Sequence, residues 1–322
     1  MKKSAIRIFA VLLCIWILSV GVYATEYLVP VGQVIGMELQ DGRLCVAAFD
    51  EKLGQNAQKA GLCQGDQILA IDGKNVSCPE DISKALTESK GNITMTICRN
   101  GKKMQLKMAP TITPDGPKLG IYLKRGITGI GTVTYYDPET GDFGALGHGV
   151  SGSDGKLAFM AAGTVYRAGI AVVKAGKVGE PGQLRGTVTQ RQPLGKLAKN
   201  TPQGVFGTIQ EAFSGEAIPV ATAEEIHTGS ATILSTVSGE TVREYSVEIL
   251  KIYPRNKQEG RNLMLRITDP ALLEVTGGIV QGMSGSPIIQ DGKLVGAVTH
   301  VLVNDPTRGY GIFIENMLDA AS

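Results

Sequence analysis

The sequence predicts a mainly β protein of about two domains behind a short apolar N-terminal segment. Glycine is abundant, with 42 of 322 residues, whereas aromatic residues make up only 5%. Such a composition favours short strands joined by many tight turns. Short apolar runs separated by turn residues recur as far as the C-terminus, a pattern typical of a sandwich or barrel rather than a βαβ fold. The length also suits about two domains.

The charge balance narrows the classes of partner. Lys plus Arg at 32 nearly equals Asp plus Glu at 30, and 43% of the residues are hydrophobic. A disordered chain would carry more charge and less apolar content, and a nucleic-acid binder usually shows a strong basic excess. We therefore expect no nucleic-acid partner. Separately, no cofactor is expected, and the glycines Gly126, Gly129 and Gly131 match neither the GxGxxG nor the GxxxxGK(S/T) pattern of a phosphate-binding loop.

Residues 1–24 have the layout of a signal peptide or membrane anchor. Lys2, Lys3 and Arg7 precede an uncharged apolar run over residues 8–23. The run falls short of the about 20 residues that a full span needs, so removal and retention of the segment both stay open. The positive flank keeps the N-terminus inside and predicts that the rest of the chain lies across a membrane.

Residues 25–112 have the element order of a small β-rich domain. Short strands are expected at 34–39 and 44–48 around a turn at 40–43, and a helix is expected at 79–89. Between them stand the sequences AGL and GDQILAIDG. This order resembles a bacterial PDZ domain.

The PDZ resemblance implies a peptide-binding groove. Its carboxylate-binding loop would be formed by Val34, Ile35, Gly36 and Met37. Successive backbone N–H groups there would hold a peptide C-terminus, or an internal segment, added as a strand. The four cysteines that follow, Cys45, Cys63, Cys78 and Cys98, leave a disulfide open.

Residues 113–322 are expected to form the second domain. Pro110, Pro114 and Pro117 mark the boundary, because proline and glycine clusters separate packed units. Short strands are expected at 126–135, 156–160, 163–165, 170–173, 186–189, 205–209, 230–234, 245–252 and 263–267.

His148 is the candidate general base of this domain. It lies in the sequence FGALGHGV, where flanking glycines leave the imidazole with little side-chain cover. The other histidines are His227 and His300, and no HxxH or HExxH spacing links any of them. A histidine metal site is therefore not expected.

Ser284 is the candidate nucleophile. It lies in GMSGSP, before a predicted hairpin, and a serine nucleophile needs a tight turn with converging N–H groups. GxSGxP resembles the nucleophile loop of chymotrypsin-like serine proteases, which implies a double β-barrel. The N–H groups of Gly282 and Ser284 would then form the oxyanion hole, with Ser286 as the rival nucleophile.

A carboxylate is expected to orient the histidine. Asp269 follows a predicted strand and stands before Ser284, and Asp142 is the other candidate. On spacing alone, Asp269 in an Asp-Pro pair also fits an ordinary turn. Residues from His300 to Gly311 are expected to border the specificity pocket.

Taken together, the export segment, the PDZ-like region, FGALGHGV, the TDP element and GGIVQGMSGSP resemble the sporulation stage IV protein B peptidases of endospore-forming bacteria. The resemblance implies His148 as general base, Ser284 as nucleophile and Asp269 as the carboxylate. It also implies export across the forespore inner membrane into the intermembrane space, self-cleavage, and cutting of a regulatory membrane protein, which leads to sigma-factor activation.

Two other functions stay open. A quality-control protease of the HtrA type would place its protease before the PDZ domain, and this chain has the reverse order. The chain could also be a PDZ scaffold whose protease domain has lost activity.

Overall fold

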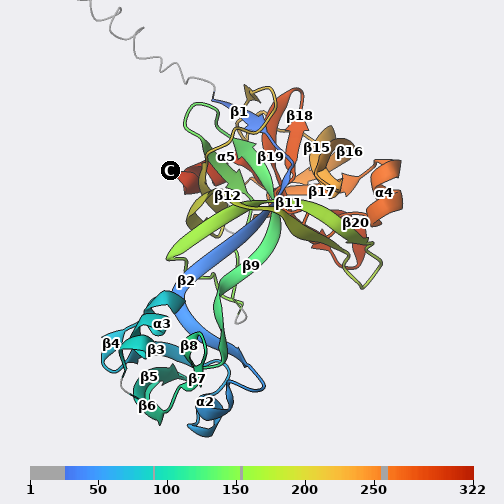
Figure 1. Ribbon diagram of the computed structural model, residues 1–322. Helices are drawn as coiled ribbons and strands as arrows, with labels where there is room; N and C mark the ends of the chain where they lie inside the picture. Colours follow the sequence, from blue (N-terminus) through green and yellow to red (C-terminus); the bar gives the residue numbers. More distant parts are fainter. Residues whose placement is uncertain (1–25, 90, 153–154, 255–259) are drawn as a thin grey trace, which may run out of the picture.

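The computed structural model describes residues 26–322 except residues 90, 153–154 and 255–259. Two β-barrels form the body of the molecule, and a smaller lobe projects from the first of them (Figure 1). The predicted export segment, residues 1–24, lies outside the described residues. Within the described part, no helix has the length and apolar character that crossing a membrane requires.

The first barrel is a sheet that closes on itself. Neighbouring strands pair around it, and the last also pairs with the first: β9 (Ile121–Tyr136), β10 (Asp142–Ala145), β13 (Gly204–Ile209), β12 (Gln183–Thr201), β11 (Ala162–Lys174) and β2 (Val34–Phe49). The short strand β1 (Tyr27–Pro30) pairs with β9 and with β14 (Ile218–Pro219). Inward apolar side chains such as Ile35, Val133, Phe143, Val165 and Val205 fill the interior.

The second barrel contains the predicted nucleophile hairpin. Its strands are β15 (Gly229–Ser238), β16 (Thr241–Ile252), β17 (Leu263–Ile267), β20 (Asp305–Phe313), β19 (Lys293–Leu302) and β18 (Pro287–Gln290). The helices α4 (Pro270–Thr276) and α5 (Ile314–Ala321) accompany them. The prediction of a mainly β fold with a double β-barrel is confirmed.

The smaller lobe has its own apolar core, drawn from residues between Leu44 and Leu119. Its elements are α2 (Gln55–Lys59), β3 (Gln67–Ile71), β4 (Lys74–Asn75), α3 (Pro79–Glu88), β5 (Ile93–Arg99), β6 (Lys102–Met108), β7 (Thr111–Thr113) and β8 (Gly116–Lys118). Helix α3 begins at Pro79, and the Asp81 carboxylate accepts the N–H groups of Ser77 and Cys78 at 2.8 and 3.2 Å. This cap and its buried apolar face explain why the helix forms as predicted.

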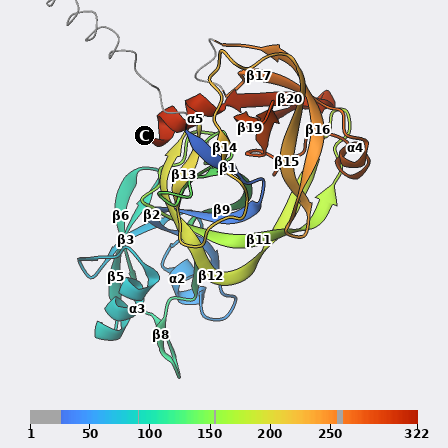
Figure 2. The same ribbon diagram turned by 90° about the horizontal axis from the view of Figure 1, so that it is seen from above.

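The lobe is inserted into the first barrel rather than placed before it. Strands β2 and β9 run side by side from the barrel into the lobe (Figures 1 and 2), with pairs from Val34 with Thr132 to Phe49 with Ile121. The turn predicted at 40–43 is therefore wrong, because β2 continues through it. The lobe also begins later than the predicted limit at residue 25. The side chains of Val29, Val31, Ile35, Met37 and Leu39 are buried in the core of the first barrel instead.

Candidate active site

The turn that carries Ser284 is held between the two barrels. From β9 of the first barrel, the Thr132 N–H donates to the Ser284 carbonyl at 3.2 Å, and the Thr132 hydroxyl donates to the Gly282 carbonyl at 2.9 Å. From β19 of the second barrel, the Val298 carbonyl accepts the Gly285 N–H at 2.8 Å. The nucleophile turn therefore lies where the barrels meet.

Gly285 allows this turn to lie so close to β9. Its φ is +98°, and a Cβ atom there would overlap the Thr132 carbonyl oxygen. The rival nucleophile Ser286 is fully buried, and its hydroxyl donates to Ser235 at 3.0 Å. Ser284 is only half-buried, so it is the serine that a substrate can reach.

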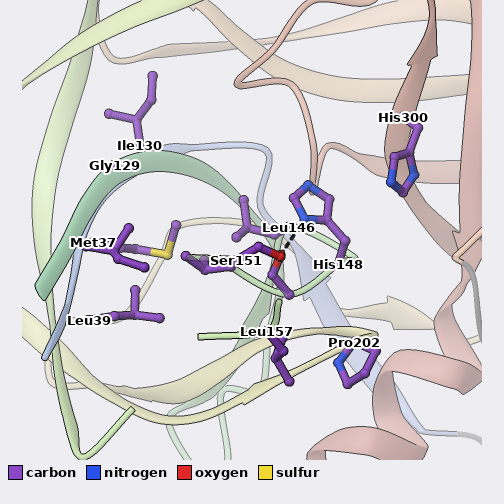
Figure 3. Close-up of a pocket in the computed structure, with 13 residues that line it drawn as sticks. Met37, Leu39, Gly129, Ile130, Leu146, His148, Ser151, Leu157, Pro202 and His300 are labelled. Atoms are coloured by element: carbon purple, nitrogen blue, oxygen red, sulfur yellow. Dashed lines mark hydrogen bonds between the residues drawn. The ribbon is translucent and has the colours of Figure 1, made fainter. Parts of the chain in front are cut away.

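His148 follows β10 on a reversed stretch of backbone. Leu146 and Gly147 have φ values of +70° and +67°, and a left-handed Leu is a strained position of the kind that gathers at functional sites. The His148 Nδ1 lies 3.0 Å from the Gly149 carbonyl oxygen (dashed line in Figure 3). A carbonyl only accepts, so Nδ1 carries the proton and Nε2 holds the lone pair.

The protonation of His148 suits a base. Burial lowers the pKa of His148 below its ordinary value, and the Gly149 hydrogen bond opposes this in part. The imidazole is therefore neutral at pH 7 and can accept a proton at Nε2.

The structure brings His148 and Ser284 together in one hollow of about 380 Å³, which we call the nucleophile cleft. Ile130, Thr299 and Val301 also line it. The Ser284 hydroxyl donates to the Thr299 carbonyl at 2.7 Å, so its proton is directed at β19 and not at the histidine. Catalytic hydrogen bonds often form only once substrate is bound.

The N–H groups predicted for the oxyanion hole are unengaged. In the described part of the chain, neither the Gly282 N–H nor the Ser284 N–H donates to a backbone oxygen. The loop before them is fixed by the start of β12: the Leu184 N–H donates to the Gln281 carbonyl at 2.8 Å, and the Gln281 N–H donates to the Gly182 carbonyl at 3.0 Å. Fixed and unpaired donors are what a developing oxyanion requires.

Asp269 lies elsewhere. It caps the N-terminus of α4, where its carboxylate accepts the Leu272 N–H at 3.0 Å and the Ser246 N–H at 3.4 Å. It is not among the residues that line the nucleophile cleft. Its role as the orienting carboxylate stays a prediction. In the structure, the Gly149 carbonyl accepts the hydrogen bond from His148 Nδ1. Asp142, the other candidate, is exposed at the start of β10.

His300 is the nearest imidazole to the base, and its ring centre lies 5.5 Å from that of His148. It follows Thr299 on β19 and lines the nucleophile cleft, as does Val301. Its Nδ1 is buried and has no hydrogen-bond partner among the described residues. Burial, helped by His148 and Arg261, lowers the pKa of His300 to about 4. The sequence suggested only that His300 begins a region bordering the pocket, because the end of an apolar strand does not reveal its neighbours.

The predicted carboxylate-binding loop is wrong. Val34, Ile35, Gly36 and Met37 lie in β2, which pairs with β9 on one edge and, from Ile35 onward, with β11 on the other. The side chains of Val34, Ile35 and Met37 are at most 4% exposed. A strand paired on both edges has no backbone groups left for a peptide.

A groove of about 260 Å³ lies instead between helix α3 and the segment that leads into β9. Ile82, Ser83 and Leu86 line it from α3, and Gly120 and Ile121 line it from the other side. We call it the α3–β9 groove. The N–H groups of Leu119 and Gly120 donate to no backbone oxygen of the described residues. Residues 121–124 of β9 pair with β2 on one edge, and no other described strand pairs with them on the opposite edge.

A sequence signal for this groove was present but missed. The run Leu119-Gly120-Ile121 repeats the apolar-Gly-apolar pattern of Ile35-Gly36-Met37. The four cysteines of the lobe are free, and the described residues hold no group of three or more His, Cys, Asp or Glu placed to bind a metal ion.

Curated proteins share parts of the sequence. The "Putative zinc metalloprotease Atu1380" of Agrobacterium fabrum is 38% identical over 88 residues, which cover 27% of this chain and 22% of that protein. The "Putative zinc metalloprotease R01501" of Rhizobium meliloti is 28% identical over 142 residues, or 44% of this chain and 34% of that protein. The chain thus spans about a third or less of the length of these relatives.

Solved structures resemble parts of the molecule. The active form of the Rv3671c protease from M. tuberculosis has a TM-score of 0.38 and 16% identity, and the match covers 61% of this chain and 73% of that one. The PDZ domain of the SdrC-like protein Lmo2051 from Listeria monocytogenes has a TM-score of 0.22 and 21% identity, and the match covers 25% of this chain and 85% of that one.

Two family matches account for the two parts of the fold. The PDZ domain family matches residues 51–99, within the inserted lobe. A second family matches residues 116–318, which include His148, Asp269 and Ser284 and make up more than half of the chain. On that match, the chain belongs to the SpoIVB peptidase S55 family.

Proposed function

We propose that the protein is a serine endopeptidase in which Ser284 attacks the peptide carbonyl and His148 takes the serine proton. The observation that carries this proposal is the nucleophile cleft, where a neutral imidazole and an accessible serine lie beside two unengaged N–H groups. The family match supports it independently.

The chemistry follows from the hydrogen bonds of the resting site. The Ser284 hydroxyl turns from the Thr299 carbonyl to His148 Nε2, and its oxygen adds to the substrate carbonyl as the proton moves to Nε2. The Gly282 and Ser284 N–H groups hold the resulting oxyanion. The imidazolium, steadied by the Gly149 carbonyl at Nδ1, then protonates the leaving amine, and water hydrolyses the acyl-enzyme by the same route.

The inserted lobe supplies the second part of the function. We propose that the α3–β9 groove binds a peptide C-terminus or internal segment as a strand added to β9, with the Leu119 and Gly120 N–H groups at a terminal carboxylate. Because β9 runs from the groove into the first barrel, a peptide bound there is held on the strand that also supports the Ser284 turn through Thr132.

We further propose the cellular setting that the sequence resemblance implies. The chain would be exported across the forespore inner membrane, tethered or released, and would cleave itself and a regulatory membrane protein in the signalling pathway of sporulation. The apolar run at residues 8–23 and the family match support this setting.

Matched serine variants test the peptidase proposal. Ser284→Ala is expected to lower self-cleavage and casein cleavage by about 10⁴-fold or more and to abolish labelling by a fluorophosphonate probe. Ser286→Ala, two residues away in the buried core, is the control and is expected to keep labelling and cleavage. Cleavage by purified Ser284→Ala protein would contradict the assignment.

A scaffold without activity is the second candidate function. The observation that favours it is the Ser284 hydroxyl bonded to the Thr299 carbonyl rather than to His148. Folded wild-type protein that neither labels nor cleaves, even with peptide added for the α3–β9 groove, would support the scaffold.

A further inference from the structure

A second hollow adjoins the nucleophile cleft on the side of the first barrel. Its volume is about 610 Å³, within the roughly 300–1,000 Å³ of typical ligand sites. It shares Ile130, Leu146, His148 and His300 with the nucleophile cleft. The two hollows therefore form one continuous surface that passes the catalytic imidazole.

The second hollow is apolar. Met37, Leu39, Ile127 and Leu157 contribute to its walls, and Figure 3 shows Met37, Leu39 and Ile130 gathered on one side of His148. Among the described residues that line it there is no Asp, Glu, Lys or Arg. A charged side chain placed there would lose water without meeting an Asp, Glu, Lys or Arg of opposite charge among these residues, whereas an apolar one would gain by leaving water.

A glycine keeps the hollow open. Gly129 lies on β9 opposite Met37 of β2 and lines the hollow. A Cβ atom at Gly129 would meet nothing within 4 Å, so this position leaves space that a side chain would fill. Leu157, which also lines the hollow, is 44% exposed. Because fully burying a leucine is favourable by about 1.5–3 kcal/mol, an apolar side chain that covered Leu157 would be stabilised.

We infer that this apolar hollow is a substrate subsite that binds bulky apolar side chains beside the scissile bond. The inference rests on the proposed function, because the occupant is the peptide whose carbonyl lies between Ser284 and His148. Such a peptide passes His148 on the surface that both hollows share, which brings its neighbouring side chains against Ile130 and Leu146. The protein would then prefer substrates with Leu, Ile, Met or Phe next to the cleaved bond.

The test uses full-length protein and fluorogenic peptide libraries in which each position flanking the cleaved bond is Leu, Phe, Ala, Asp or Lys. Wild-type protein is expected to cut the Leu and Phe peptides with at least about tenfold higher kcat/KM than the Ala peptides at one flanking position, the gain that an apolar pocket gives. Asp and Lys there are expected to be the poorest. Equal cleavage of charged and apolar peptides would overturn the subsite.

Gly129→Val fills the hollow with little risk to folding, because Gly129 lies in a strand and valine suits strands. The variant is expected to lose at least about tenfold in kcat/KM for the Leu peptide and less than about twofold for the Ala peptide. An equal loss on both peptides would contradict the inference.

Leu157→Ala provides a second variant, and Val172→Ala is its control, since Val172 is 54% exposed outside the hollow. We expect only Leu157→Ala to reduce the preference for Leu over Ala. Fluorophosphonate labelling of Ser284 separates the two proposals: labelling and cleavage without apolar preference refute the subsite alone, whereas absence of both from the wild type refutes the peptidase.

Discussion

One sequence pattern, apolar-Gly-apolar, occurs both in Ile35-Gly36-Met37 and in Leu119-Gly120-Ile121, but the two runs differ in how many neighbouring strands they pair with. The first lies in the barrel part of β2 with β9 on one edge and β11 on the other. The second leads into β9, and in the described chain only β2 pairs with that end of the strand. The first is barrel wall, and the second borders a groove of about 260 Å³.

This difference shows that an apolar-Gly-apolar run does not by itself make a peptide site. Peptide addition needs a free strand edge and unpaired N–H groups, and both depend on which strands lie alongside. The glycines also differ. Gly120 has φ +61°, and a Cβ atom there would overlap the backbone of Leu53 and Gly54. Gly36 lies in a strand, and a Cβ atom there would meet only side chains, with Val188 nearest at 3.0 Å and Tyr166 and Ala168 at 3.7 and 3.8 Å.

Truncating one side chain in each run is expected to give the largest difference between the two regions. Ile35→Ala is expected to lower the free energy of unfolding by about 2–5 kcal/mol, because Ile35 is fully buried. Ile121→Ala, at a half-buried position, is expected to cost less than about 2 kcal/mol but to weaken binding of labelled peptides with free C-termini. Urea unfolding and fluorescence anisotropy measure the two effects. Loss of peptide binding in folded Ile35→Ala protein, with Ile121→Ala unaffected, would reverse the assignment.

The same substitution at the two glycines should have a smaller but unequal effect. Gly120→Ala forces a side chain into left-handed backbone against Leu53 and Gly54, and we expect a loss of about 1–3 kcal/mol together with weaker peptide binding. Gly36→Ala needs only a shift of Val188, which is 51% exposed, so we expect a change within about 1 kcal/mol. Equal destabilisation of the two variants in thermal unfolding would remove the distinction.

Lowering the pH is expected to reduce cleavage at Ser284 while leaving peptide binding in the α3–β9 groove almost unchanged, and it requires no substitution. Since burial lowers the pKa of His148, the base stays neutral to below pH 6.5. We expect kcat/KM to be constant at neutral pH and to fall about tenfold per pH unit beneath that lowered pKa.

Peptide binding in the α3–β9 groove should change little between about pH 5 and 8, the range in which an ordinary histidine titrates. Hydrogen bonds from the Leu53 and Lys52 N–H groups lower the pKa of the groove residue Asp50, so it stays ionised. Binding and cleavage measured on the same preparation give both curves. Parallel loss of both activities would indicate acid unfolding instead of titration at His148.

The motifs around His148 and Ser284 were predictable because each depends on local backbone. Gly285 and Gly147 both have positive φ values, which favour glycine. The glycines of the two motifs therefore indicate these turns from the sequence alone. The distance between the two motifs was not predictable. They meet because β9 and β19 hold the Ser284 turn from the two barrels, through Thr132 and Val298.

Asp269 and the inserted lobe show where local patterns mislead. A carboxylate before Pro is equally suited to capping a helix and to orienting a histidine, and the structure places Asp269 at the N-terminus of α4. The lobe was expected to begin near residue 25 because the strands predicted at 34–39 and 44–48 were both assigned to the PDZ domain. The strands that carry it, β2 and β9, belong to the barrel at their other ends, and that connection is a long-range pairing which no short pattern records.

Sequence patterns alone were enough to predict the mainly β architecture, the turn that exposes Ser284, the glycine-flanked His148 and the presence of a PDZ lobe. Each of these follows from backbone preference or hydrophobic pattern over a few neighbouring residues. Three features could be read only from the folded molecule: the insertion of the lobe between β2 and β9, the free strand edge beside one of the two similar runs, and the apolar hollow that adjoins His148. Those outcomes depend on strand pairing and packing between residues far apart in the chain.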